Sequence, residues 1–152
     1  EMRDAETIST VLEAADSGHK VFTTLHTSSA VESIDRILGE TPPIEQPRIR
    51  ERLASVVSCV ISQKLVATLD GKLAMAKEVM VGTVPVRSAI RNNRTEEIYQ
   101  IIQQSNNEGM ITLEQDLARL VKSGIVAHDE AMNNANNKKR FEDLMRYDRQ
   151  PA

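Results

Sequence analysis

The sequence predicts an α/β fold in two regions: mixed helices and strands over residues 1–81, then an all-helical region over residues 82–152. Two observations lead to this prediction. Residues 20–25, KVFTTL, combine β-branched and aromatic side chains without polar alternation, which is typical of a strand buried on both faces of a parallel sheet. After Gly82 and Pro85, apolar residues recur only at helical spacing.

Capping residues mark helices on both sides of the predicted strand. Asp4 is a suitable N-cap for a helix over residues 5–17, in which apolar side chains recur at intervals of three and four. Ser29 and Glu32 have the spacing of a capping box and predict a second helix that reaches Leu38. The helices and the strand together predict a helix-strand-helix unit.

The remaining elements are a long helix, a hairpin and a series of short helices. Residues 46–63 have one apolar face and predict a single helix. Residues 64–69 and 73–80 predict a hairpin, because Asp70-Gly71 between them suits the positive φ angles of a tight turn. Five further helices are predicted, over residues 84–92, 95–104, 112–123, 127–136 and 138–147.

The composition argues against several classes of protein. A net charge of -3 and an aromatic content of 3% disfavour a general nucleic-acid binder, which needs a basic surface and stacking side chains. The single cysteine, Cys59, cannot form an internal disulfide or a structural zinc site with the 3 histidines, so we expect a reducing compartment. No apolar run reaches the roughly 18 residues of a membrane span. We therefore expect no nucleic-acid partner and no membrane span.

Polar side chains gather at one edge of the predicted sheet. Residues 1–4, EMRD, precede a helix, so we expect a strand upstream of them, and Thr24 and His26 end the strand over 20–25. Ligands of open α/β sheets bind beyond the carboxyl ends of the strands. A carboxylate there can orient a magnesium-bound or attacking water, and an imidazole can donate to a terminal phosphate oxygen. The pattern favours a nucleoside triphosphatase.

Each of these residues also has a simpler interpretation. A histidine at the end of a strand is often only a structural hydrogen-bond partner, which applies to His26. Glu1 and Asp4 can favour the start of a helix through its dipole, and His19 can bond to the end of the preceding helix. From the residues alone, both interpretations stay open.

Residues 1–30 read EMRDAETISTVLEAADSGHKVFTTLHTSSA. A strand ending in Gly-Glu-Met/Ile-Arg-Asp and a His box, Gly-His-x-Val-x-x-Thr-Leu-His-Thr, are features of the bacterial secretion ATPases. The stretch closely resembles this family, most of all its type IV pilus retraction (PilT-like) branch. The resemblance continues through ESIDRI, SVVSCVISQKLV, EVMVGTVPVRSAIR and GMITLEQDLARLV, and so covers about the whole chain.

The resemblance implies a fold and a set of site residues. Residues 1–81 would be the C-terminal part of a RecA-like P-loop NTPase core, and residues 82–152 a helical C-terminal domain. Glu1 would be the Walker B glutamate, acting indirectly on Mg²⁺, and His26 would face the γ-phosphate of ATP; these two are the candidate catalytic residues. The candidate nucleotide-binding residues are Arg3, Asp4, His19, Thr24 and Thr27.

The resemblance also implies a biological role. The intact protein would be a homo-hexameric ATPase in the cytoplasm, peripheral to the inner membrane at the base of the pilus. It would act on an inner-membrane platform protein and power pilus retraction, and hence twitching motility, by hydrolysing ATP.

Three features refine these expectations. Residues 85–91, PVRSAIR, keep the arginines of the AIRNLIR-like segment of the retraction branch but not the whole motif. No G-x-x-x-x-G-K-[ST] phosphate loop is present, so most triphosphate affinity is lacking and we expect the chain by itself to be catalytically silent. One cysteine cannot build the four-cysteine zinc module usual in extension and type II secretion ATPases, which favours retraction. Two alternatives to a retraction ATPase are kept. One is a fragment of a pilus-extension or type II secretion ATPase, and the other is a stand-alone helical module that docks on a partner through residues 84–147.

Overall fold

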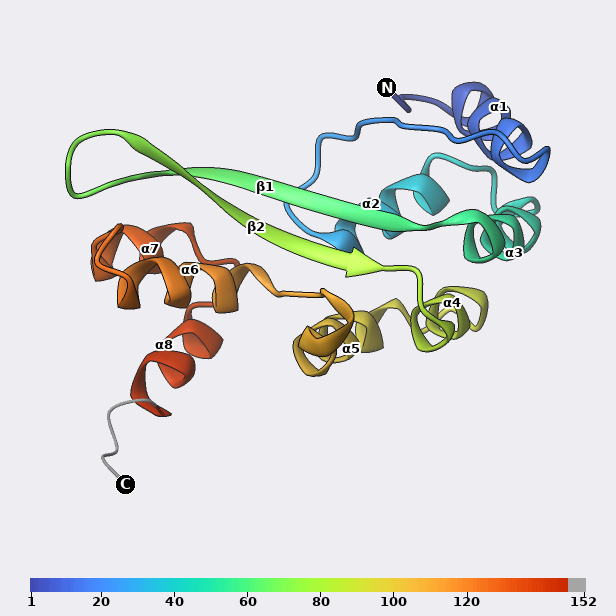
Figure 1. The fold of residues 1–152 in the computed structure, drawn as a ribbon. Helices are drawn as coiled ribbons and strands as arrows, with labels where there is room; N and C mark the ends of the chain where they lie inside the picture. The colour runs from blue at the N-terminus through green and yellow to red at the C-terminus, as the bar shows by residue number, and fades with distance from the viewer. Residues whose placement is uncertain (148–152) are drawn as a thin grey trace.

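A long two-stranded antiparallel hairpin runs through the computed structural model, with helices packed at both of its ends (Figure 1). The structure describes residues 1–147. In chain order the helices and strands are α1 (Ala5–Asp16), α2 (Ala30–Gly39), α3 (Gln46–Val56), β1 (Cys59–Ala67), β2 (Leu73–Val81), α4 (Val84–Arg91), α5 (Ile98–Gln104), α6 (Leu113–Lys122), α7 (His128–Asn134) and α8 (Lys138–Tyr147), with short 3-10 turns at Thr95–Glu97 and Asn106–Glu108.

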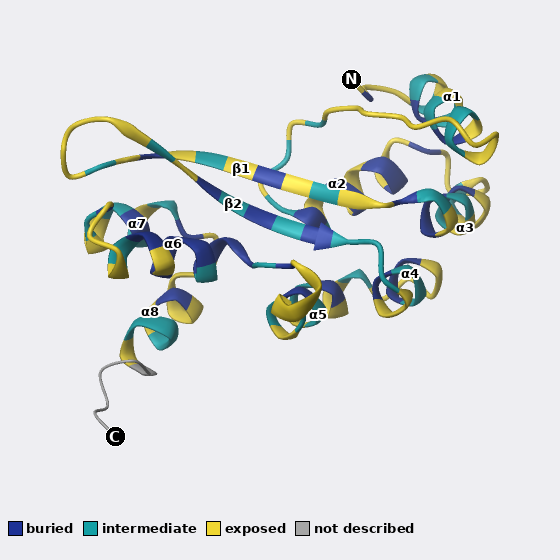
Figure 2. Cartoon of the chain, in the orientation of Figure 1, coloured by how far each residue is buried: buried dark blue, intermediate teal, exposed yellow. Residues whose placement is uncertain are grey.

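The hairpin has one covered face and one open face. Its register pairs Cys59 with Val81 at one end and Ala67 with Leu73 at the other. Side chains alternate across the sheet, so Val66, Ala76 and Met80 are buried, whereas Ile61, Leu65 and Leu73 lie on the open face and are exposed. Figure 2 shows this alternation as changes of colour along β1.

Two apolar clusters hold the helices on the hairpin. The larger cluster contains side chains from all of the helices α1 through α5, which pack around the end of the hairpin that carries Met80. The smaller one joins α6, α7 and α8 around Val66 and Ala76, with Phe141 of α8 fully buried. In Figure 1 the two groups of helices lie near opposite ends of the strands. The division into domains at residue 81 stays a prediction.

Most of the helices lie where the sequence predicts them. Asp4 is the N-cap of α1, since its Oδ1 accepts a hydrogen bond of 2.8 Å from the Thr7 amide. Ser29 is the N-cap of α2 and its Oγ accepts from the Glu32 amide at 3.1 Å. The Glu32 side chain bonds to Ser28, so the second half of the expected capping box involves the preceding residue. Helices α4 to α8 overlap the five helices predicted after Gly82.

The strand predicted over residues 20–25 is absent. The segment is extended and Thr24 accepts a main-chain hydrogen bond of 3.1 Å from Met2, but the segment belongs to no β-ladder. Phe22 is 95% exposed, and the segment is yellow over most of its length in Figure 2. A strand buried on both faces needs neighbouring strands, and the described residues supply no such neighbours for it.

The single helix predicted over residues 46–63 is also wrong. Helix α3 ends at Val56, and β1 begins at Cys59. The β-branched residues between Val56 and Ile61 fit a helical period and a strand period equally well in a short window. Pairing with β2 selects the strand, because a ladder from Cys59 to Ala67 provides hydrogen-bond partners for the backbone amides and carbonyls of this stretch.

Candidate functional site

The structure places the two candidate catalytic residues side by side. His26 Nε2 lies 3.0 Å from Glu1 Oε1, and Arg3 Nη2 donates to Glu1 Oε2 at 2.7 Å. The hydrogen bond between Met2 and Thr24 aligns the two stretches of chain that carry the pair. The hydrogen bond from Arg3 lowers the pKa of Glu1 below its usual range, so the carboxylate is ionised at neutral pH. An ionised acid and an imidazole therefore share one exposed site.

The side chain of Asp4 caps the start of α1. Its carboxylate accepts the Thr7 amide, and this bond lowers the pKa of Asp4. The arrangement is that of an acidic N-cap, which satisfies a free amide at the helix start.

His19, Thr24 and Thr27, the other candidate nucleotide-binding residues, bond to residues outside the pair. His19 Nδ1 lies 2.8 Å from Ser17 Oγ, and the His19 amide donates to Ala14 at the end of α1. Thr27 Oγ1 lies 2.6 Å from Ser33 Oγ in α2. Thr24 contributes its carbonyl oxygen to the bond with Met2. Their roles in nucleotide binding stay predictions.

A groove of about 1150 Å³ lies beneath the extended segment before His26. It is bounded by α1, α2, the end of α3 and the start of β1, and its apolar lining includes Leu12, Leu25, Ile34 and Leu53. His26 and Glu1 are not among its lining residues. Polar side chains, among them His19, Lys20 and Thr27, also line the groove, so its surface is mixed.

The residues present fit part of a magnesium-nucleotide site. Protein-bound Mg²⁺ keeps several waters and uses one or two carboxylates together with substrate phosphates. The Glu1 side chain is ionised and 25% exposed, which fits a contact through water. Over residues 1–147 no group of three or more His, Cys, Asp or Glu side chains could hold a metal ion by itself.

Comparison with known proteins assigns the chain to a family. Residues 1–146 match the family model described as type II/IV secretion system protein. The chain belongs to this family. The resemblance read from residues 1–30 is thereby confirmed.

Relatives within the secretion ATPase family include pilus motors. The chain is 40% identical over 135 residues to the type IV pilus retraction ATPase PilT of Pseudomonas aeruginosa, and 40% identical over 138 residues to a twitching motility protein of Neisseria gonorrhoeae. These alignments cover 89% and 90% of this chain but 39% and 37% of the relatives. The chain thus spans about two fifths of the length of these relatives.

Solved structures of secretion ATPases have the same fold. A crystal structure of the pilus retraction motor PilT with bound ADP matches with a TM-score of 0.85 at 34% identity, over 94% of this chain and 40% of that one. The ATPase DotB of Legionella pneumophila matches with a TM-score of 0.75 at 29% identity, over 88% of this chain and 36% of that one. The predicted α/β fold of this part of a secretion ATPase is confirmed. In the described part of the chain, none of the helices is long and apolar enough to cross a membrane.

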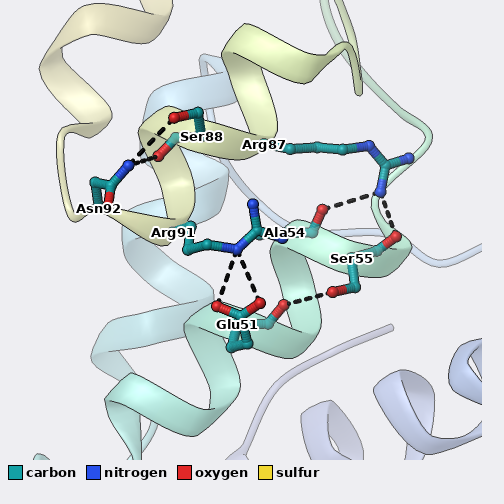
Figure 3. Close-up of polar contacts among 7 residues, drawn as sticks. All are labelled: Glu51, Ala54, Ser55, Arg87, Ser88, Arg91 and Asn92. Atoms are coloured by element: carbon teal, nitrogen blue, oxygen red, sulfur yellow. Dashed lines mark hydrogen bonds and ion pairs between the residues drawn. The ribbon is translucent and has the colours of Figure 1, made fainter.

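The arginines of the PVRSAIR segment bind α3 in this type II/IV secretion system protein (Figure 3). Arg87 donates from Nε to the carbonyl of Gly82 at 2.7 Å, and from Nη1 to the carbonyls of Ala54, at 2.9 Å, and Ser55. Arg91 Nε lies 2.8 and 2.9 Å from the two carboxylate oxygens of Glu51. Both side chains therefore hold α4 against α3.

A buried polar cluster between the hairpin and the C-terminal helices was not indicated by the sequence patterns. It is built on Glu78 of β2, which is 2% exposed, and Glu114 of α6, which is 0% exposed. The available signal was positional: Glu78 lies two residues from both Ala76 and Met80 and so shares their face of the strand, which a correct hairpin register identifies as the covered face. A charged residue at an inward position is uncommon and has a specific partner when it occurs.

Proposed function

We propose that these residues form the C-terminal part of the ATPase core, and the helices that follow it, of a type IV pilus retraction motor. The motor would use ATP hydrolysis to power twitching motility. The observation that carries the proposal is the Glu1–His26 pair, 3.0 Å apart, in a chain 40% identical to PilT over 89% of its length.

The residues of the pair would have distinct roles. Glu1 is ionised through its bond with Arg3 and would orient the attacking water by accepting its proton in a hydrogen bond. Mg²⁺ with bound ATP would neutralise phosphate charge. His26 Nε2, which contacts Glu1 here, would donate to the γ-phosphate when nucleotide is present. Because α2 begins four residues after His26, at Ala30, a change of partner at the imidazole would act directly on that helix.

Retraction is favoured over pilus extension. The match to PilT covers 89% of the chain, whereas the match to the assembly ATPase PilB of the same organism covers 52%. The single cysteine, Cys59, agrees with this assignment. The stand-alone helical module is not favoured, because the family match spans residues 1–146 and includes Glu1 and His26.

We extend the proposal to assembly and location. The intact motor would be a homo-hexamer on the cytoplasmic face of the inner membrane at the base of the pilus, acting on the membrane platform protein. The support is the similarity to a named pilus retraction motor.

A chimaeric motor tests the proposal. This chain would replace the matching part of Pseudomonas aeruginosa PilT, which would provide the phosphate loop that the chain lacks. We expect ATP hydrolysis by the chimaera, and a loss of about 100-fold or more in kcat for Glu1→Gln and His26→Ala. His128→Gln, in α7, is the matched control. Unchanged hydrolysis by His26→Ala would reduce this histidine to a structural role, and absence of hydrolysis in a folded hexameric chimaera would contradict the proposal.

A further inference from the structure

Side chains of α2 hold the turn that follows His26. Arg36 Nη1 donates to the carbonyl of His26 at 3.3 Å, and Thr27 Oγ1 lies 2.6 Å from Ser33 Oγ. Glu32 Oε2 accepts from both the amide and the hydroxyl of Ser28, at 2.7 and 2.6 Å. Residues 26–28 are thus joined to α2 at consecutive positions and are expected to move with it.

The same turn is also bonded to the loop between α7 and α8. Asn136 donates from Nδ2 to the carbonyl of Ser28 at 3.1 Å, across 108 positions of sequence. The oxygen of the same side-chain amide is also bonded, because Asn136 Oδ1 accepts from Lys64 Nζ at 2.7 Å. Lys64, on β1, further donates to the carbonyl of Asn134 at 2.9 Å. Asn136 therefore links the turn to the hairpin and to the end of α7.

A second bond fixes the first residue of α2 to β2. Glu78 Oε1 accepts from the Ala30 amide at 2.8 Å, and both residues are buried, with exposures of 2% and 0%. The amides at a helix start lack partners within the helix, and an acidic side chain is favoured there by the helix dipole. A buried amide that lost this acceptor would be left unsatisfied.

Glu114 continues the cluster toward the last helices. Its carboxylate accepts from Tyr99 Oη at 3.0 Å and from the Asn137 amide, just before α8, at 2.9 Å. A small cavity of about 390 Å³ is lined by Ser28, Ser29, Glu78, Tyr99, Glu114 and Asn136. The turn after His26 and the start of α8 thus share one polar cluster.

We infer that Asn136 and Glu78 are positioning residues that connect the His26 turn to the C-terminal helices and the hairpin. Asn136 acts through the carbonyl of Ser28, and Glu78 through the amide of Ala30. A displacement of His26 is transmitted through these two bonds to β2 and to the segment between α7 and α8. The catalytic consequence of the connection rests on the proposed function of His26, whereas the connection itself is a property of the nucleotide-free chain.

Solution NMR on the 152-residue chain tests the connection without nucleotide. Asn136→Ala removes the link to Ser28, and Asn133→Ala is the matched control, because Asn133 is exposed in the same asparagine-rich stretch. We expect Asn136→Ala to shift the imidazole ¹H–¹³C peaks of His26 and the amide peaks of residues 27–30. We expect Asn133→Ala to leave all of these peaks in place.

Substitutions of Glu78 test the second bond. Glu78→Met removes the acceptor, and we expect hydrogen exchange of the Ala30 amide to become about fivefold to tenfold faster. Glu78→Gln keeps an oxygen at the same position and should restore slow exchange. If Glu78→Met does not fold, the Asn136 and Asn133 variants decide the inference.

The outcomes separate the inference from the proposed function. If Asn136→Ala lowers the melting temperature but leaves the His26 peaks unmoved, the connection is overturned, regardless of the ATPase activity of the chimaera. Equal exchange of the Ala30 amide in wild type and a folded Glu78→Met variant would overturn the role of Glu78. If Asn136→Ala moves the His26 peaks but His26→Ala does not change ATP hydrolysis by the chimaera, the connection stands and the catalytic role of His26 is refuted.

Discussion

Arg87 donates a hydrogen bond of 2.9 Å from Nη1 to the carbonyl oxygen of Ala54, in the last turn of α3 (Figure 3). The same nitrogen also bonds to the carbonyl of Ser55, and Nε bonds to that of Gly82. Carbonyls at a helix C-terminus have no partners within the helix. Arg87 supplies these partners, and its charge has the favourable sign for that end of the dipole.

Replacement of Arg87 should therefore cost far more than replacement of Arg91. Arg87→Met keeps the apolar stem but leaves the carbonyls without their donor, and we expect the free energy of unfolding to fall by about 1–3 kcal/mol. Arg91→Met breaks an exposed ion pair with Glu51 and should cost less than about 1 kcal/mol. Urea unfolding of both variants measures the difference. Equal losses would show that the α3 carbonyls are satisfied without Arg87.

Gly82 is required for a close backbone approach after β2. A Cβ atom at this position would lie 2.1 Å from the carbonyl oxygen of Val57, which is far inside contact distance. We expect Gly82→Ala to destabilise the chain by more than about 2 kcal/mol, because backbone must move to accept the methyl group. Gly39→Ala, in α2, meets no atom within 4 Å and should stabilise the chain by about 0.5–1 kcal/mol. Thermal unfolding of the pair checks the opposite signs.

Glu78 should make the stability of the chain depend on pH. Burial raises the pKa of Glu78, and this outweighs the bond from Ala30, which lowers it. An acid with a raised pKa binds its proton more tightly in the folded state, so stability falls as pH rises from about 4.3 through the raised value. Glu78→Gln cannot ionise, and its free energy of unfolding should increase relative to wild type over that range. Urea unfolding between pH 4 and pH 8 measures the difference, and a constant difference would contradict the assignment.

The capping box of α6 should contribute measurably to stability. Thr112 is fully buried, its Oγ1 accepts from the Gln115 amide at 3.2 Å, and the Gln115 side chain accepts from the Thr112 amide at 2.9 Å. Thr112→Ala removes the cap and should cost about 1 kcal/mol. Thr10→Ala, on the exposed side of α1, should be neutral or slightly stabilising because alanine is the better helix former. A loss for both threonines in chemical unfolding would show that the cap is not the cause.

The closeness of Glu1 and His26 was predictable, but the reason given for it, a shared edge of a parallel sheet, is not found in the described residues. The prediction placed Glu1 and His26 near one another, and in the structure the two side chains are in contact. The two stretches are joined without a β-ladder, by the Met2–Thr24 main-chain bond and the Glu1–His26 contact. The partners of Glu78 were not predictable, because Ala30 lies 48 positions away and nothing local marks the contact.

The sequence by itself determined the features that depend on neighbours within about four residues. Asp4 and Ser29 begin helices, and Asp70-Gly71 closes the hairpin with Gly71 at a φ of +79°. Only the tertiary structure decided the path of residues 57–63, because their apolar pattern fits a helix as well as a strand, and residues 59–63 become a strand through pairing with β2. Local caps and turns are specified by hydrogen bonds along the chain, whereas strands and buried carboxylates obtain their partners only when distant segments pack together.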